Sequence, residues 1–395
     1  MAHRPTCTGM SKELQESHVF NSGLTSPQSS YPNDPTPASF WPRGYTQLSM
    51  AGSKQSHNLG QFIRRRYGNI LSDEYQPQEV YMRSVDDDSS LMSAQAVLSG
   101  MYSESSEVIG QPVHTVPLRY EMLFGHPSEC PHLRDLLQHA HSSSAAYDLY
   151  SKHKDVIDHY LMLAGFQLNQ KIPQKISTFV NLTLDIITSH LNNASIPEWA
   201  SPDVLDNLSS LVLERKEELL DDYDILRLTI GPLVDEILNR TLHKVEGTLN
   251  PSLRMYLYSA PSVSLEALLI QASALDRLVP VSSAIFFELH RMGSVYEIQV
   301  VYRNGMDHAA VPLTLDGCFG DSCELEDFVH WMLHKAYDGD LEAWMEDCRH
   351  GHHHNIGGVV AIAIVIAMLL VGLFAMVYWC NKKRKGEIGY RESAQ

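Results

Sequence analysis

The feature that most constrains this chain is an uninterrupted apolar segment near its carboxyl end. Residues 356–379 form a run of 24 residues without a charged side chain. A run of this length can cross a bilayer as one helix. Tyr378 and Trp379 stand where an interfacial aromatic belt is expected, and a basic cluster follows at 382–385. Because basic residues mark the cytosolic side, we expect one transmembrane helix, a cytosolic tail over 380–395 and a non-cytosolic domain before the helix.

Glycosylation sequons and cysteine pairs support this topology. Asn-x-Ser/Thr, with x other than proline, is a glycosylation acceptor in secreted proteins. Such sequons begin at Asn181, Asn193, Asn207 and Asn239. Cys318 and Cys323 can close a short loop, and Cys130 and Cys348 then remain to pair over a long range. Disulfides persist in oxidising compartments, so we expect a lumenal or extracellular domain.

The amino-terminal segment conflicts with that topology. Residues 1–30 are rich in Ser, Thr, Pro and Gly, and they contain no apolar stretch of signal-peptide length. We predict a disordered arm over 1–30. We interpret it as an incomplete or alternative amino terminus, because a non-cytosolic domain before a single carboxyl-terminal span needs a leader.

The charge balance excludes one class of partner. The formal net charge is −17 at pH 7, whereas a nucleic-acid-binding domain needs a basic patch for the phosphate backbone. We therefore expect no nucleic acid, and we assign no metal or cofactor. The linker over 349–355 contains three consecutive histidines at 352–354. We interpret them as part of an unstructured spacer rather than as a metal site.

Apolar periodicity predicts strands towards both ends of the chain and helices between them. The predicted elements are helices over 61–67 and 89–101, strands over 79–82, 253–259, 285–289 and 296–302, and a mostly helical region over 131–244. The last two strands are typical of a hairpin. This order predicts an α/β core that carries an inserted helical domain.

Four segments carry a family resemblance. They are 40–48 (FWPRGYTQL), 80–94 (VYMRSVDDDSSLMSA), 112–118 (PVHTVPL) and 257–260 (LYSA). Together they resemble the histidine acid phosphatase family, in its membrane-bound lysosomal and prostatic-type branch. The resemblance covers 31–348. It implies a phosphoglycerate-mutase-like α/β core with the helical insertion at about 131–244, a phosphomonoester ligand and a homodimer.

The resemblance also implies a chemistry whose key residues are replaced here. In the family, a histidine within Arg-His-Gly-x-Arg-x-Pro on the first strand attacks phosphorus, arginines hold the phosphoryl oxygens, and the aspartate of a His-Asp pair protonates the leaving alcohol. Pro261 and Ser262 stand where the His-Asp pair is expected. Neither can serve as the acid or supply a cation. We expect the nucleophile segment and its strand to be absent, so no catalytic residue is assigned.

Two further positions match the family pattern. Arg83 matches a phosphate-binding arginine, and two interpretations stay open: it faces phosphate, or it pairs with a carboxylate of Asp86, Asp87 or Asp88. The three aspartates bring negative charge next to an anion site, which disfavours phosphate binding. His114 also matches a family position, and we interpret it as a buried, hydrogen-bonded structural histidine.

Two functions follow from these expectations. In the first, the chain is a single-pass type I membrane protein of the family with impaired catalysis, retained as a binding or structural module. In the second, it is an acid phosphatase represented by an incomplete or alternative isoform. Lysosomal, endosomal and cell-surface membranes are all compatible with the sequence.

Overall fold

A strand close to the amino terminus forms the middle of the sheet. The computed structural model describes residues 12–103, 110–125, 129–306, 309–318, 320–337 and 339–350. Its seven-stranded sheet has the order β2-β3-β1-β4-β5-β6, with β7 paired to β5. The strands are β1 (Lys12–Phe20), β2 (Val80–Ser84), β3 (Met255–Ser259), β4 (Ala284–Met292), β5 (Val295–Arg303), β6 (Val311–Pro312) and β7 (Cys323–Glu324). β1 is parallel to β3 and antiparallel to β4, and β2 is parallel to β3.

The prediction of a disordered arm over 1–30 is therefore wrong, because β1 lies within it. The strand escaped detection because Gln15, Glu16, Ser17 and His18 are polar, although each is at most 2% exposed in the structure. A buried strand is normally recognised by a run of apolar side chains, and β1 ends with only two. Its place in the sheet comes from backbone pairing on both sides.

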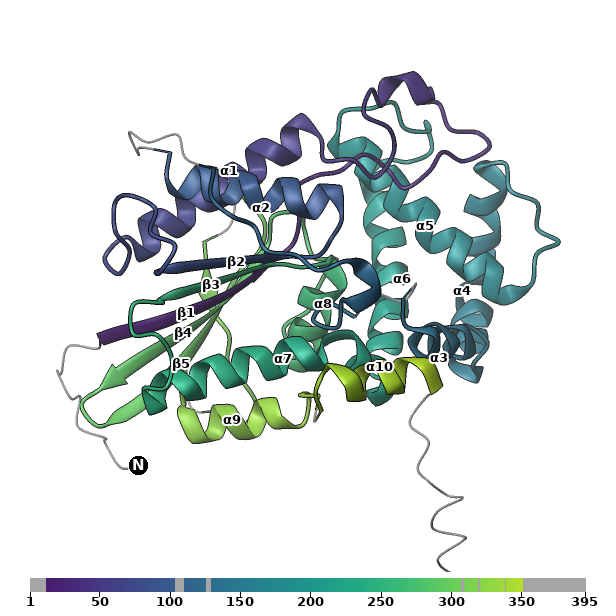
Figure 1. Cartoon of the computed structure of the whole chain (residues 1–395). Coiled ribbons are helices and arrows are strands. Elements are labelled where there is room, and N and C mark those ends of the chain that lie inside the picture. The colour runs from purple at the N-terminus through teal and green to yellow at the C-terminus, as the bar shows by residue number, and fades with distance from the viewer. Residues whose placement is uncertain are drawn as a thin grey trace, which may run out of the picture. The chain divides into compact units, whose positions relative to one another are not determined.

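Helices cover both faces of the sheet (Figure 1). They are α1 (Met50–Tyr67), α2 (Asp88–Met101), α3 (Pro131–His141), α4 (Ser144–Leu163), α5 (Ile172–Leu191), α6 (Pro202–Leu220), α7 (Tyr223–Glu246), α8 (Ser262–Gln271), α9 (Leu325–Leu333) and α10 (Leu341–His350). α1 and α2 pack on one face through a core that includes Leu59, Val97 and Phe286. α7, α8 and α9 pack on the other face through a core that includes Ile230 and Phe287.

Side-chain hydrogen bonds and a glycine cap the ends of several helices. The Ser49 side chain accepts a hydrogen bond from the Gly52 amide at the start of α1 (3.0 Å), and the Asp87 side chain caps α2. α7 ends at Gly247, whose φ of 74° is readily adopted only by glycine. The predicted helices over 61–67 and 89–101 and the strands over 79–82, 253–259, 285–289 and 296–302 are all present with shifted ends.

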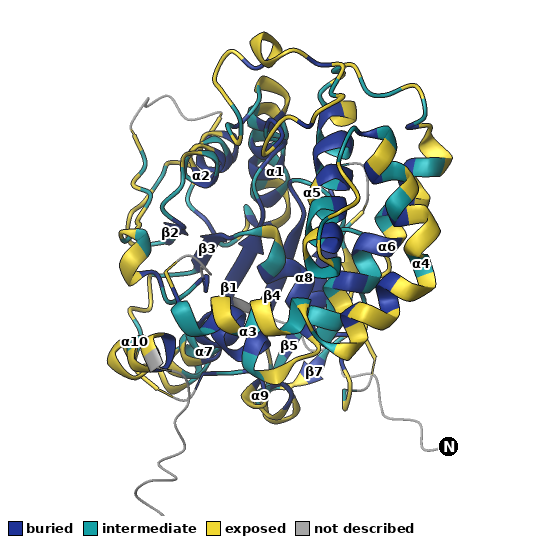
Figure 2. Cartoon of the chain, turned by 90° about the vertical axis from the view of Figure 1, so that its right-hand side faces the viewer, coloured by how far each residue is buried: buried dark blue, intermediate teal, exposed yellow. Residues whose placement is uncertain are grey.

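The predicted helical region over 131–244 is confirmed as helices, but it does not form one separate insertion. α4, α5 and α6 share a core of their own, whereas α7 lies against the sheet and contributes to the sheet core. The described residues up to Cys348 belong to one compact unit. Figure 2 shows buried residues in the sheet and on the inner faces of the helices around it, α5 and α6 included.

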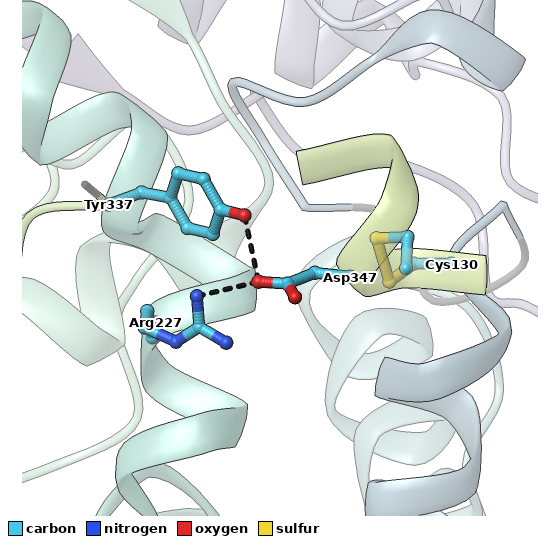
Figure 3. Close-up of a disulfide and its surroundings, with 5 residues drawn as sticks. Cys130, Arg227, Tyr337 and Asp347 are labelled. Atoms are coloured by element: carbon cyan, nitrogen blue, oxygen red, sulfur yellow. Dashed lines mark hydrogen bonds and ion pairs between the residues drawn. A yellow bond between two sulfur atoms is a disulfide. The ribbon is translucent and has the colours of Figure 1, made fainter. Parts of the chain in front are cut away.

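Both predicted disulfides are present, Cys130–Cys348 and Cys318–Cys323. The first joins the start of α3 to α10. Beside it, Asp347 accepts hydrogen bonds from Arg227 of α7 (2.9 Å) and from the Tyr337 hydroxyl (2.8 Å), as Figure 3 shows. Covalent and polar contacts therefore fix α10 at its attachment to the rest of the unit.

Several predictions fall at or beyond the limits of the described residues. The predicted membrane segment 356–379 and tail 380–395 lie outside them. Within the described part, no helix is long and apolar enough to cross a bilayer. The predicted linker 349–355 is corrected at its first two positions, because α10 continues to His350.

A polar cluster is buried beneath α1. Glu16 of β1 lies directly opposite Glu288 of β4, and the Tyr67 hydroxyl and the Arg66 guanidinium both donate to Glu288 Oε1 (2.6 and 2.8 Å). His18 packs against the Tyr67 ring, with centroids 4.7 Å apart. Burial lowers the pKa of His18 from 6.5 to about 3, with Glu288 acting in the opposite direction and Arg66 adding to the shift.

This depressed pKa predicts a loss of stability in acid. Below pH 6.5 the unfolded chain protonates His18, but the folded chain does not do so until the pH nears 3, so the free energy of unfolding falls across that interval. We expect His18 to account for about 2–3 kcal/mol of the loss between pH 7 and 4.5.

The comparison of wild type with His18→Phe, by urea unfolding at pH 7 and 4.5, tests this expectation. The variant should lose less stability on acidification by about that amount, and His159→Asn, at an exposed position on α4, should keep the wild-type difference. An unchanged difference in His18→Phe would show that His18 is not the group responsible.

Candidate functional site

The candidate site lies where three parallel strands end together. Phe20 of β1 and Ser84 of β2 are both in register with Ser259 of β3, so the loops that follow these strands start at the same edge of the sheet. The carboxyl ends of parallel strands are the usual location of ligand sites in open α/β sheets. The Ala260 amide donates to the Phe20 carbonyl (2.9 Å), which joins two of these loops.

The loop after β1 has the spacing of the nucleophile motif without its chemistry. It reads Asn-Ser-Gly-Leu-Thr-Ser-Pro over 21–27, and its glycine and proline occupy the third and seventh positions of Arg-His-Gly-x-Arg-x-Pro. The prediction that this segment and its strand are absent is therefore wrong. Ser22 occupies the nucleophile position, and Asn21 and Thr25 occupy the two arginine positions.

Close packing explains why the glycine of the motif is present. A Cβ atom on Gly23 would lie 2.1 Å from the carbonyl oxygen of Gly52 in α1. The Gly23 amide also donates to the Ser93 hydroxyl of α2 (3.2 Å). Any larger residue at position 23 would push the loop away from both helices, so the scaffold of the motif remains while three of its charged or nucleophilic side chains are replaced.

Two of the replaced positions contact each other. The buried Asn21 amide nitrogen donates to the Ser262 hydroxyl (3.1 Å) and to the Pro280 carbonyl (2.9 Å). Asn21 Oδ1 accepts from the Ser283 amide (2.8 Å). The structure thus brings the first arginine position of the motif against the acid position of the His-Asp pair, and both now carry neutral side chains that satisfy one another.

Ser22 is half-buried at this edge. Its carbonyl accepts a hydrogen bond from the Ser282 amide (3.0 Å), but its hydroxyl has no hydrogen-bond partner among the described residues. A serine nucleophile requires a nearby general base to take its proton. Among the described residues, no base forms a hydrogen bond with the Ser22 hydroxyl.

Arg83 is buried and paired with a different carboxylate from the one predicted. Its guanidinium donates to Glu121 Oε2 and to the Ser84 carbonyl, and it lies over the Phe124 ring at 5.6 Å. Glu121 is fully buried. Burial raises the pKa of Glu121, and the Arg83 charge acts in the opposite direction. Of the two interpretations, the structure supports the ion pair, but with Glu121 rather than with Asp86, Asp87 or Asp88.

The three aspartates stand at the end of β2 and at the start of α2. Asp87 Oδ1 accepts from the Ser90 amide (2.9 Å) and from the Ser89 hydroxyl (2.7 Å), and so caps α2. Asp86 is half-buried and Asp88 is exposed. Carboxylates at this edge repel a phosphate, and the helix amino terminus that would attract an anion is already occupied by Asp87.

His114 is exposed, so the prediction of a buried histidine is wrong. Its backbone extends the sheet edge beside β2, because the His114 amide donates to the Met82 carbonyl (2.8 Å) and its carbonyl accepts from the Ser84 amide (2.9 Å). The imidazole stacks on the Tyr81 ring with centroids 4.8 Å apart. The residue is structural through its backbone, and its side chain covers Tyr81.

Comparison with known proteins places the chain in a family. The profile of the histidine phosphatase superfamily (branch 2) matches residues 4–303. Prostatic acid phosphatase of Rattus norvegicus is 30% identical over 364 residues, which cover 88% of this chain and 92% of that protein. Lysosomal acid phosphatase of Xenopus laevis is 29% identical over 391 residues, covering 93% and 86% of the two chains. The chain therefore belongs to branch 2 of the histidine phosphatase superfamily.

A solved structure agrees on the fold. The phytase of Hafnia alvei superimposes with a TM-score of 0.65 over 83% of this chain and 98% of the phytase, at 12% sequence identity. At this level of identity the likeness concerns the arrangement of sheet and helices alone.

The Arg83–Glu121 pair predicts strong coupling in stability. Replacing Arg83 by Met leaves a buried carboxylate without its partner, which typically costs roughly 3–5 kcal/mol. Arg83→Met combined with Glu121→Leu should recover a large part of that loss, because both charges are then removed.

Urea unfolding of the two single variants and the double variant measures this coupling. Lys152→Met, which breaks an exposed ion pair with Glu214, serves as the control and should change stability by less than about 1 kcal/mol. If the two single losses simply add in the double variant, Arg83 does not depend on Glu121 for its place in the fold.

Proposed function

We propose that this protein is a non-catalytic member of the histidine acid phosphatase family that serves as a binding or structural module. The observation that carries the proposal is the hydrogen bond from Asn21 to Ser262. It joins two positions that, in the family, hold a phosphate-binding arginine and the acid for the leaving group. Here the two side chains are neutral and bonded to each other.

The residues that meet each requirement of the family's reaction are replaced or neutralised in this chain. Phosphoryl transfer through an enzyme intermediate needs a nucleophile, fixed cations around the phosphoryl oxygens and an acid for the leaving group. Ser22 replaces the histidine, Asn21 and Thr25 replace two arginines, and Pro261 and Ser262 replace the His-Asp pair. Arg83 keeps its charge, but Glu121 neutralises it within the fold.

The alternative function is an acid phosphatase represented by an incomplete or alternative isoform. One of the two observations that favoured it, the absence of the first strand, no longer holds. The first strand is present as β1, so its supposed absence no longer argues for a longer active form. The names of the relatives still favour this alternative, because they are acid phosphatases. Pro261 and Ser262 lie far from the amino terminus, however, and a different amino terminus would not restore them.

The surroundings of the domain support a lumenal or extracellular location in a membrane protein. The sequon residues are all exposed, at Asn181, Asn193, Asn207 and Asn239. The two disulfides fit an oxidising compartment, and the run over 356–379 meets the length requirement of a membrane helix. Lysosomal acid phosphatases among the relatives favour the lysosomal or a related membrane.

Hydrolysis of p-nitrophenyl phosphate by the purified full chain between pH 4 and 6 tests the proposal, with the rat prostatic enzyme as positive control. We expect no turnover above the enzyme-free blank, because removing catalytic residues that act as a unit costs roughly a millionfold in rate. Turnover above the blank that disappears in Ser22→Ala would falsify the proposal.

A variant that carries the family's residues at the replaced positions tests whether these replacements alone account for the expected lack of activity. It combines Asn21→Arg, Ser22→His, Thr25→Arg, Pro261→His and Ser262→Asp, and its folding is checked by circular dichroism. We expect detectable turnover, because the backbone of both loops keeps the family's spacing. A folded but inactive variant would mean that positions beyond these five also prevent the reaction.

A further inference from the structure

A cavity of about 890 Å³ lies away from the strand ends, beside α9. It is lined by residues from the end of α8, from the loop that leads to the Cys318–Cys323 disulfide, and from α9 and the turn after it. None of its lining residues belongs to the candidate site at the ends of β1, β2 and β3. Its titratable lining residues are Asp316, Asp327, His330, His334 and Lys335.

Two histidines on one helix face line this cavity. His330 and His334 are four residues apart, a spacing that places side chains next to each other on a helix. Their ring centroids are 5.1 Å apart in an edge-to-face arrangement, so a rotation of the rings would direct a nitrogen of each towards one metal ion. A tetrahedral metal with metal–nitrogen distances of about 2.0–2.1 Å would separate two imidazole centroids by roughly 5 Å. Both side chains are exposed, and neither has a hydrogen-bond or ion-pair partner among the described residues.

The charges around the two histidines favour a cation. Asp327 lies three residues before His330, on the same face of α9, and Asp316 lines the cavity from the loop before the disulfide. His334 is at the carboxyl end of α9, where the helix dipole stabilises positive charge.

Lys335 opposes this preference only in part. It is 8% exposed, and its ammonium donates to the Trp331 carbonyl (2.5 Å) and lies 4.2 Å from the centre of the Trp331 ring. The ammonium is thus directed to the end of the helix. The two aspartates supply more negative charge to the cavity lining than this lysine supplies positive charge.

We propose that His330 and His334 bind a divalent transition-metal ion, with Zn²⁺ as the expected occupant and Asp327 as a third ligand. Imidazole and carboxylate donors suit Zn²⁺. In the described part of the chain no three such side chains already converge, so the Asp327 side chain has to turn towards the metal, and water completes the coordination.

Calorimetric titration of the full chain with Zn²⁺ at pH 7.2 tests this site. The histidine run at 352–354 can also take up metal, so all variants carry His352→Ala, His353→Ala and His354→Ala. In that background we expect one bound Zn²⁺ per chain, and no such binding after His330→Asn with His334→Asn. The exposed His159→Asn serves as the matched control and should keep the site. At pH 5 binding should weaken, because protons compete for imidazole.

The Asp327→Asn variant tests whether the carboxylate is a third ligand or whether the two histidines alone bind the metal. If the carboxylate is a ligand, Zn²⁺ affinity should fall roughly tenfold or more while the stoichiometry stays at one. Equal affinity in Asp327→Asn would overturn the three-ligand assignment. Binding that persists unchanged without His330 and His334, or no binding in the background chain, would overturn the site itself.

Discussion

The placement of β1 between β3 and β4 is the constraint on which the candidate site depends. Parallel pairing with β3 aligns Phe20 with Ser259, and antiparallel pairing with β4 aligns Phe20 with Ala284. These registers bring Asn21 within reach of Ser262 on one side and of Ser283 on the other. Without this strand, the loops from opposite ends of the sequence would have no fixed relation to one another.

The same strand carries buried polar groups that a central strand rarely holds. Glu16 and His18 lie beneath α1 in a cluster organised by Tyr67 and Glu288. Buried polar residues need partners to offset their desolvation. Here Tyr67 and Arg66 donate to Glu288, whereas His18 relies on ring contacts and lies 3.7 Å from Glu16. The fold has therefore kept a consistent set of contacts around β1 while the catalytic side chains at its end differ from those of the family.

The charges at the strand ends differ from those that the family's reaction needs, although the loop after β1 keeps the spacing of the motif. The family's reaction requires several cations that face a phosphate, whereas Arg83 is the one motif arginine kept at this edge, and it is paired with Glu121. Asp86, Asp87 and Asp88 add negative charge at the end of β2. At Asn21 the loop after β1 is held by hydrogen bonds between neutral groups, so this part of the backbone does not depend on the charged side chains of the motif.

The sequence allowed a large part of this structure to be predicted. The periodicity of α1, α2, β4 and β5 and the pairing of four cysteines were readable because they rest on local pattern or simple pairing. β1 was missed because its polar residues do not resemble a buried strand. The loop after it does not read as the motif because Asn21 and Ser22 replace its arginine and histidine, although Gly23 and Pro27 keep the spacing. The Arg83–Glu121 pair joins a strand to a distant loop, and no local pattern indicates it.

If the protein is non-catalytic, as we propose, its strand-end site should not hold a phosphoryl group. Calorimetric titration of the full chain with inorganic phosphate at pH 5 tests this most directly, with the rat prostatic enzyme as positive control. We expect no saturable binding to this chain under conditions where the control binds. Saturable binding that is weakened by Ser22→Ala or Thr25→Ala would contradict this expectation, because it would show that the loop after β1 still forms an anion site.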